Sequence, residues 1–444
     1  ASPSSSSAAT APSAPDTMTR QELRSSGSLA LIFALRMLGL FLVLPVFALE
    51  AQHYAGGNDP AMVGLALGMY GLTQAVFQLP LGLASDRFGR KKVIIVGLLV
   101  FALGSLVAAL ADSLMGLVWG RALQGAGAVS AAVTALLADL TRDSVRTKAM
   151  AMVGGSIALM FSLALVLSPL LAGWVGLSGI FWITLALTLA GMAAVLWVVP
   201  PEPVQHTAMP RGRFADLLAY PDLLRLNVGV FVLHTVQMAM WVAVPTLLVQ
   251  AGLVKTAHWQ VCLPAVLLSF AALGRLFAME RKGQLRSALL LAIVLVLLVQ
   301  AGLGALTLAG DAPSLWLLGA AMLVFFIGFN MLEATQPSLV SRMAPDRLRG
   351  AALGAYNTLQ SLGLFAGGFL GGWLSRHGSL TGVFAATALL CVVWLVVTWP
   401  LQPIGRNADK TTYKELLAPL FISNMALSSL ISFLIKAQVP IVFT

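Results

Sequence analysis

Long apolar stretches alternate with short polar connections along most of the 444-residue chain. A helix needs roughly 20 residues to cross a hydrocarbon core of about 30 Å. Because backbone groups in lipid must be hydrogen-bonded internally, and because the stretches are continuous rather than alternating, they predict helices rather than strands. We expect twelve membrane spans, near residues 28–50, 61–84, 92–111, 114–137, 149–175, 179–200, 226–250, 259–279, 287–309, 313–337, 350–374 and 381–400.

The longest polar interruption falls between the sixth and seventh spans and divides the chain into two halves of six spans. An apolar stretch near the C-terminus, 416–435, carries a polar stripe typical of a helix that lies on the membrane surface, although a thirteenth span is the alternative. The expected organisation is a disordered N-terminal tail over 1–27, a first half over 28–200, a linker over 201–225, a second half over 226–400 and a tail over 401–444.

Composition and charge agree with a membrane protein. Hydrophobic residues make up 59% of the chain and charged residues 10%, whereas soluble domains are about 25% charged. Of the 27 Lys and Arg residues, 21 lie before the first span, in the even-numbered connections and at 406–414, while the odd-numbered connections hold only Lys255 and Arg376. This bias places both termini in the cytoplasm. It also accounts for the net charge of +10, so no basic surface is left for nucleic acid.

The two halves repeat each other in sequence. Asp143 and Arg146, after the fourth span, recur as Asp346 and Arg349 after the tenth, at a constant offset of 203 residues. Parallel repeats of this kind are typical of transporters built from two halves around a central site. The two cysteines both lie inside apolar stretches and predict no disulfide.

Several motifs carry a resemblance to a known family. The stretch GLASDRFGRKK at 82–92 resembles the loop signature of the major facilitator superfamily, GRALQGAGAVSAAV in the fourth span resembles the second signature of its proton-driven members, and SPLLAGWVG in the fifth is similar to the third signature of drug:proton antiporters. The likeness covers about residues 20–400 and is closest to the YajR-type branch, through FALRMLGLFLVLPV, YGLTQAVFQLPLG, LLADLTRDSVRTKAMA and FNMLEATQPSLVSR. It implies an all-α membrane protein of twelve helices in two pseudo-symmetric halves around a cavity.

The resemblance implies that the charged cluster after the second span is a conformational latch. Such a latch joins the cytoplasmic ends of the two halves while the outer side is open. Asp86 is expected to face the positive start of the eleventh span, and Arg90 to pair with Asp139. The simpler interpretation, that basic residues here only set topology, suits Lys91 and Lys92 best. The latch residues are Gly82, Asp86, Arg87, Gly89, Arg90 and Asp139, the two glycines allowing close backbone approach.

Polar residues inside the spans recur in every third helix. Ionisable groups there cost about 2.5–3.5 kcal/mol on insertion scales and usually face a cavity or a partner. In the family that the chain resembles, these four helices line the cavity. The residues are Arg36 in the first span, Arg121 in the fourth, His234 and Gln237 in the seventh, and Asn330 and Glu333 in the tenth.

Glu333 is the carboxylate placed furthest inside a span. Arg36 and His234 lie roughly 12 Å from the cytoplasmic ends of their helices, and Glu333 lies about one turn from the end of its own, so the three are expected to meet. We hypothesise that Glu333 binds and releases a proton with Arg36 or His234 as its partner. The alternative is a static ion pair.

Three further residues have expected roles. Arg121 is expected to take part in proton coupling, because its motif matches that of the proton-driven members. Gln237 and Asn330 are expected either to line the substrate cavity or to form hydrogen bonds between helices.

These observations predict a secondary transporter in a bacterial-type inner membrane. The expected function is proton-coupled efflux of small amphipathic drug-like or sugar-like molecules by alternating access, by a monomer whose partners are its substrate, protons and lipid. The alternatives are a uniporter, a proton symporter or a scaffold that no longer transports. The motifs contain no metal cluster or nucleophile triad, so neither an enzyme nor a cofactor or metal is expected.

Overall fold

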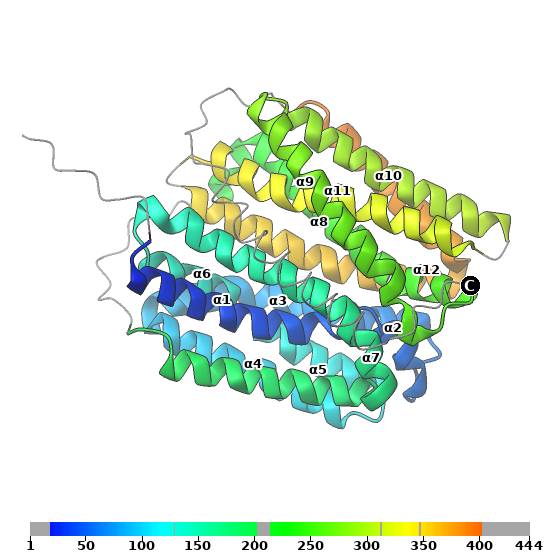
Figure 1. The fold of residues 1–444 in the computed structure, drawn as a ribbon, viewed down its shortest axis with the longest axis horizontal. Coiled ribbons are helices and arrows are strands. Elements are labelled where there is room, and N and C mark those ends of the chain that lie inside the picture. Colours follow the sequence, from blue (N-terminus) through cyan, green and yellow to red (C-terminus); the bar gives the residue numbers. More distant parts are fainter. Residues whose placement is uncertain (1–17, 128, 202–213, 311–312, 346–347, 402–444) are drawn as a thin grey trace, which may run out of the picture.

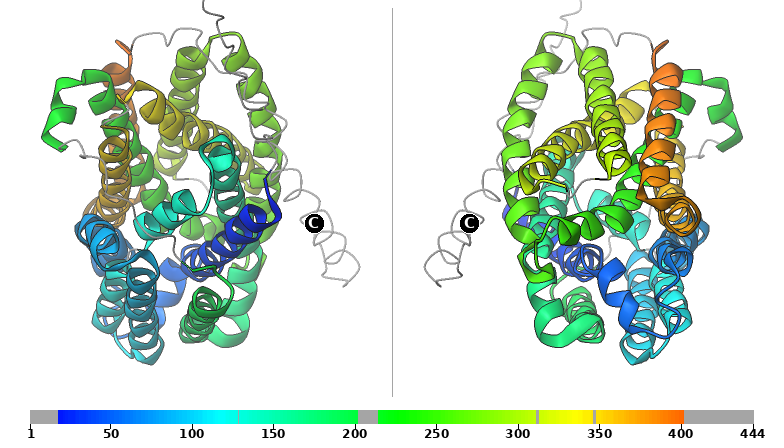
Figure 2. Two further views of the ribbon diagram at one scale, coloured as in Figure 1. Left: turned by 90° about the vertical axis from the view of Figure 1, so that its left-hand side faces the viewer. Right: turned by 90° about the vertical axis from the view of Figure 1, so that its right-hand side faces the viewer.

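The computed structural model describes residues 18–127, 129–201, 214–310, 313–345 and 348–401 (Figure 1). The expected surface helix or thirteenth span at 416–435 lies outside these residues, as does the part 202–213 of the expected linker. Within the described part, nine helical stretches are long and apolar enough to cross a membrane. The helices run side by side along the bundle, and Figure 2 shows the two halves as two clusters, one above the other.

The helices follow one another in two sets. The N-terminal half contains α1 (Arg20–Phe41), α2 (Phe47–Glu50), α3 (Pro60–Phe88), α4 (Arg90–Leu110), α5 (Leu114–Ala126), α6 (Ser130–Asp139) and α7 (Asp143–Trp197). The C-terminal half contains α8 (Pro221–Gln250), α9 (Trp259–Arg281), α10 (Leu285–Ala309), α11 (Leu315–Met343) and α12 (Arg349–Thr398). Three short 3-10 turns are η1 (Ala51–His53), η2 (Phe214–Ala219) and η3 (Lys255–Ala257).

The expected twelve spans are confirmed once the breaks within helices are considered. α7 is interrupted by Gly176, whose φ of 65° is left-handed, and α12 is interrupted by Ser379, whose φ is 71°. Each of these long helices therefore supplies two crossings. Conversely, α1 and α2 together form the first span, and α5 and α6 together form the fourth.

Three boundaries differ from those expected. α1 begins at Arg20, inside the expected tail, because Thr19 and Glu22 form a capping box at its start. α8 begins at Pro221, inside the expected linker, because proline fits the first turn of a helix. α11 continues past Pro337 to Met343, which puts Glu333 roughly 15 Å from the end of the helix rather than one turn.

The two halves touch closely at one end of the bundle. We call the end that the charge bias assigns to the cytoplasm the inner side, and the opposite end the outer side. In the outer part of the bundle, α3 and α12 approach so closely that a Cβ atom on Gly64 would lie 2.1 Å from the Gly368 carbonyl oxygen. A Cβ atom on Gly68 would lie 2.7 Å from the Phe365 carbonyl oxygen. Only glycine permits this contact between backbones.

Ion pairs and aromatic rings join the same halves. Lys255 of η3 pairs with Glu50 of α2, and Arg376 of α12 pairs with Asp59 at the start of α3, each at 2.9 Å. Deeper in the bundle, a cluster of aromatic rings from α1, α7, α8 and α11 crosses between the halves, with ring centroids 5.2 to 6.3 Å apart. Its members are Phe41, Phe161, Trp241 and Phe326. The structure is therefore closed on its outer side.

Replacing Gly64 with alanine should weaken this closure. The added methyl group meets backbone atoms of α12, and overpacking of this kind costs about 1–3 kcal/mol. We expect the native thiol of Cys262, which is 4% exposed in the outer part of α9, to react about five-fold faster with a membrane-impermeant maleimide added to right-side-out vesicles. Gly191→Ala is the control, because a Cβ atom there meets nothing within 4 Å. Equal rates in the two variants would show that this packing does not hold the outer side shut.

Candidate functional site

His234 of α8 and Glu333 of α11 face each other inside the C-terminal half, with 3.3 Å between Nε2 and Oε1. His234 Nδ1 lies 3.0 Å from the carbonyl oxygen of Val230, and Nε2 lies 2.8 Å from the amide nitrogen of Gln360 on α12. A carbonyl oxygen only accepts, so Nδ1 donates. An amide nitrogen only donates, so Nε2 accepts. These neighbours therefore hold the neutral tautomer of His234.

The Glu333 carboxyl group is positioned to exchange a proton. Its side chain keeps 35% of its surface accessible, against 5% for His234, so it borders space that the protein does not fill. Its Oε1 atom is nevertheless buried without a hydrogen bond. Protonation of His234 at Nε2 would supply a donor for Oε1, provided that Gln360 turned its amide oxygen toward the ring. One proton can thus reside on either member of the pair.

Arg36 does not join this pair, contrary to the expectation that all three groups meet. Its Nη2 atom donates to the Tyr70 hydroxyl at 2.8 Å and its Nη1 atom to Ser130 Oγ at 3.5 Å. The guanidinium also lies 5.3 Å from the centre of the Phe101 ring. These partners belong to α3, α6 and α4 of the same half. The break between α5 and α6 places Ser130 at the start of a helix that faces α1, so both terminal nitrogens of Arg36 have partners in their own half, while Nε has none among the described residues.

Arg121 of α5 is fully buried and also contacts Tyr70, with its guanidinium 4.9 Å from the ring centre. Its Nη1 atom donates to Gln124 Oε1 at 2.9 Å, and Gln124 in turn donates to Ser105 Oγ at 2.9 Å. The Nε and Nη2 atoms of Arg121 have no hydrogen-bond partner among the described residues. Two arginines therefore contact one tyrosine, Arg36 at its hydroxyl and Arg121 at its ring, and both are stabilised by aromatic and neutral polar groups.

The two candidate cavity residues differ in their surroundings. Asn330 donates to Ser269 Oγ of α9 at 2.7 Å, which is a hydrogen bond between helices. Gln237 is partly exposed and forms no hydrogen bond with any other described residue. The sequence did not identify Ser269 and Gln360 as site residues, because a single serine or glutamine in an apolar helix belongs to no motif.

The expected pair between Arg90 and Asp139 is present. Arg90 Nε lies 3.1 Å from Asp139 Oδ2, and Arg90 Nη1 contacts Asp86 and donates to Ser85 Oγ at 2.7 Å. All four residues belong to the N-terminal half. Arg87 is exposed, with its guanidinium 5.4 Å from the Phe88 ring centre.

A close backbone approach is not found at the latch glycine Gly82 in this structure. Among the described residues, a Cβ atom on Gly82 would meet only Ala131 of its own half, at an ordinary 3.5 Å. Gly89 has a φ of 104° and forms the turn between α3 and α4. The physical reason is that the halves pack together on the outer side in this structure, so the cytoplasmic end of α3 has no backbone of the other half against Gly82.

Lys91 does more than set topology. Its Nζ atom donates to the Val199 carbonyl oxygen just after α7, at 2.6 Å. In the other half, Arg286 at the start of α10 donates to the Trp399 carbonyl oxygen just after α12, at 2.5 Å. A cation on the last carbonyl groups of a helix complements the negative end of its dipole. In both halves, the third span is thereby tied to the sixth.

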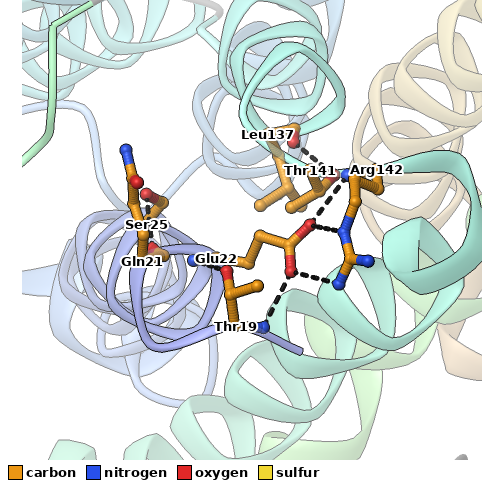
Figure 3. A network of polar contacts seen from close by, with 7 residues as sticks. All are labelled: Thr19, Gln21, Glu22, Ser25, Leu137, Thr141 and Arg142. Carbon is orange, nitrogen blue, oxygen red and sulfur yellow. Dashed lines mark hydrogen bonds and ion pairs between the residues drawn. The ribbon is translucent and has the colours of Figure 1, made fainter. Parts of the chain in front are cut away.

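A second buried acid was missed by the sequence analysis (Figure 3). Glu22 on α1 accepts hydrogen bonds from Arg142 Nε at 2.8 Å, Arg142 Nη2 at 3.0 Å and the Arg142 backbone nitrogen at 3.1 Å. It also accepts one from the backbone nitrogen of Thr19 at 2.8 Å. The capping-box spacing of Thr19 and Glu22 signals a helix start, but nothing in the sequence indicates that Arg142, far along the chain, completes the site. The pair fixes the inner ends of α1 and α7 to each other.

Glu22→Gln should destabilise the protein more than the same change at a comparable ion pair. The Glu22 side chain is 8% exposed and loses its bidentate partner. Asp222, at the start of the corresponding helix α8, is 21% exposed and pairs only with Arg225 on the same helix. We expect thermal unfolding in detergent to show a fall of several degrees in Tm for Glu22→Gln and little change for Asp222→Asn. A fall no larger than that of the control would mean that the Glu22 contact contributes no net stability.

Comparisons with known proteins agree with this architecture. The sequence profile of the Major Facilitator Superfamily matches residues 29–368. The inner membrane transport protein YajR of Escherichia coli strain K12 is 42% identical over 385 residues, covering 86% of this chain and 84% of that protein. The multidrug resistance protein MdtH of Aeromonas salmonicida is 28% identical, covering 77% of this chain and 84% of that protein. A crystal structure of a bacterial homologue of the human lysosomal transporter Spinster superposes with a TM-score of 0.68 at 14% identity, covering 90% of this chain and 99% of that one. The chain is therefore a multi-pass membrane transporter and belongs to the major facilitator superfamily.

Proposed function

We propose that the protein is a proton-coupled exporter of small amphipathic drug-like or sugar-like molecules. The observation that carries the proposal is the pairing of Glu333 with His234 inside the membrane, where the carboxyl group is accessible and its histidine partner is buried. An ionisable pair at this depth is costly, and such pairs usually mark a substrate or proton pathway. The resemblance to a protein named for multidrug resistance supports the direction of export.

The outer-closed structure represents one end of the proposed cycle. In this state Glu333 releases its proton to the inner side and substrate enters the space beside it. The halves then rock, the outer side opens, substrate leaves and Glu333 is protonated again. Coupling arises because a carboxylate facing unfilled space within the membrane is costly, so the empty outer-open protein returns most readily after Glu333 has bound a proton.

Arg36 and Arg121 assist the proposed coupling electrostatically. Both are buried and contact Tyr70 in the N-terminal half, and no carboxylate of the described residues is among their contacts. Their positive charge acts across the centre of the bundle and favours the ionised form of Glu333 whenever the halves bring them closer. Gln237, which is partly exposed on α8, is the proposed contact for polar groups of the substrate.

The latch belongs to the opposite state of the proposed cycle. When the outer side opens, the inner ends of α3 and α12 approach, and Gly82 and Asp86 meet the start of α12. Arg90 holds Asp86 ready for this contact while it also pairs with Asp139. This arrangement requires both termini to lie in the cytoplasm, as the distribution of Lys and Arg predicts. We also propose that a single chain completes the cycle.

Glu333→Gln should uncouple the protein. A glutamine keeps the shape of the side chain but carries no exchangeable charge. In proteoliposomes with an imposed pH gradient, screened against cationic dyes and sugars, we expect substrate to release protons with the wild type and not with Glu333→Gln, while binding persists. Asp222→Asn, which removes a carboxylate at the inner end of α8, is the control and should behave as wild type. Proton release that survives in Glu333→Gln would contradict the assignment, and transport with no proton movement in the wild type would indicate a uniporter.

Asp86→Asn should slow transport without weakening binding from the inner side. The neutral side chain loses its attraction to the positive start of α12, worth about 0.3–1 kcal/mol or more when partly buried. The outer-open state is then populated less, and turnover falls by about two-fold to five-fold. Lys92→Gln, an exposed charge in the same cluster, is the control. Equal rates of dye or sugar transport in the two variants would leave Asp86 with a topological role only.

A further inference from the structure

A small enclosed pocket lies between the two halves on the outer side of the aromatic cluster. Pro45, between α1 and α2, and Pro169 of α7 line it from the N-terminal half. The C-terminal half contributes apolar side chains of α8 together with His258 and Cys262 at the start of α9. The pocket lies where the packing of the two halves closes the outer side of the bundle.

His258 is the unusual member of this lining. It is 4% exposed, and its Nε2 atom has no hydrogen-bond partner in the part of the chain that the structure describes. The ring keeps one hydrogen bond, to the carbonyl group of Leu253. An imidazole nitrogen buried without a partner destabilises the closed structure, so its position calls for an explanation. No role in the coupling described above accounts for it.

Few charged groups surround this ring. The segment η3 contributes Lys255, which pairs across the interface with Glu50 of α2 at 2.9 Å. Glu50 also lies 3.6 Å from the exposed ring of His53. From α9 comes the thiol of Cys262, and the lining residues of α7 and α8 carry no titratable group. Glu50, the nearby carboxylate, is therefore already engaged with Lys255 and His53.

We infer that His258 is a second proton-binding site of the transporter, which takes its proton from the outer side and opens the outer pathway when it does. The inference rests on the proposed proton coupling and adds a site to it. A proton on Nε2 puts a positive charge into a pocket lined by apolar side chains, next to Lys255. Separation of the halves admits water to the ring and removes this penalty.

The direction of the effect follows from linkage. Burial lowers the pKa of His258 to about 4 in the closed structure, and Lys255 lowers it further, while the Leu253 carbonyl acts in the opposite direction. In an opened, hydrated pathway the ring regains a pKa of about 6.5. The open state therefore binds more protons, and it gains population as the outer pH falls from about 6.5 toward 4. The expected change in the ratio of open to closed protein is about ten-fold between pH 7.5 and pH 5.5.

Such a site makes the outer opening respond to the same protons that drive export. Acid outside opens the pathway, which exposes the interior to those protons and allows substrate to leave. Glu333 and His258 then have separate tasks, because Glu333 carries the transported proton and His258 adjusts how often the outer side opens.

The test measures the outer opening directly and needs no substrate. Spin labels are placed on cysteines introduced at Asp112, between α4 and α5, and at Ser314, before α11; both are exposed at the outer end in opposite halves. The native thiols of Cys262 and Cys391 are removed by Cys262→Ala and Cys391→Ala in every variant, because Cys262 lines the pocket and becomes reactive when the outer side opens. Distances from double electron–electron resonance in lipid nanodiscs give the fractions of open and closed protein at each pH.

We expect the open-to-closed ratio of the wild type to rise about ten-fold from pH 7.5 to pH 5.5, and that of His258→Gln to stay constant. His53→Gln and His377→Gln, which remove exposed histidines of the outer side, are the matched controls and should respond as wild type. Glu333→Gln, which mimics the protonated carboxyl group, should lower the open-to-closed ratio at every pH but keep its rise as the pH falls, so the result stands apart from the outcome of the proton-release assay.

Three results would overturn the inference. They are a wild type without a response, a response that persists in His258→Gln, and a response that disappears in Glu333→Gln. Should His258→Gln fail to fold, the wild type decides alone. Its response must begin below about pH 6.5 and level off near pH 4, and a response centred above pH 7 belongs to another group.

Discussion

The contact between the backbones of α3 and α12 determines the state of the whole molecule. Gly64 and Gly68 on one helix and Gly368 on the other remove the side chains that would hold the helices apart. Lipid offers no hydrophobic force between helices, so close van der Waals packing of this kind is the main attraction available inside a membrane. The contacts of α3 nearer the inner side depend on this closure. With the outer ends together, Gly82 meets only its own half, and Arg90 pairs with acids of its own half.

The membrane spans and the division into halves were predictable because lipid imposes a simple rule on the sequence. A crossing needs about 20 apolar residues, and loops retain their charges on one side. The same rule did not predict where the helices begin and end, because a helix can continue through polar residues beyond its apolar stretch. α1 starts early through its capping box, and α11 passes Pro337 because a membrane helix tolerates proline.

The site was predictable in part, for a geometric reason. Approximate depth along a helix can be estimated from the sequence, and the expected meeting of His234 and Glu333 is found although Glu333 lies deeper than expected. The direction in which a side chain points depends on how the helices rotate and break, which the sequence does not reveal. The break between α5 and α6 brings Ser130 to Arg36, and the helix ends bring Arg142 to Glu22. Both arginines therefore have partners that no motif contains.

The positive-φ joints within α7 and α12 lie at equivalent positions of the two halves. Gly176 and Ser379 are separated by 203 residues, the offset that also relates Asp143 to Asp346. Among the described residues, Ser379 is the non-glycine residue with a positive φ, and its φ of 71° and ψ of 173° fall in a region that costs an L-residue about 1–3 kcal/mol. The second half therefore keeps the backbone shape of the first at an energetic cost that glycine spares the first half.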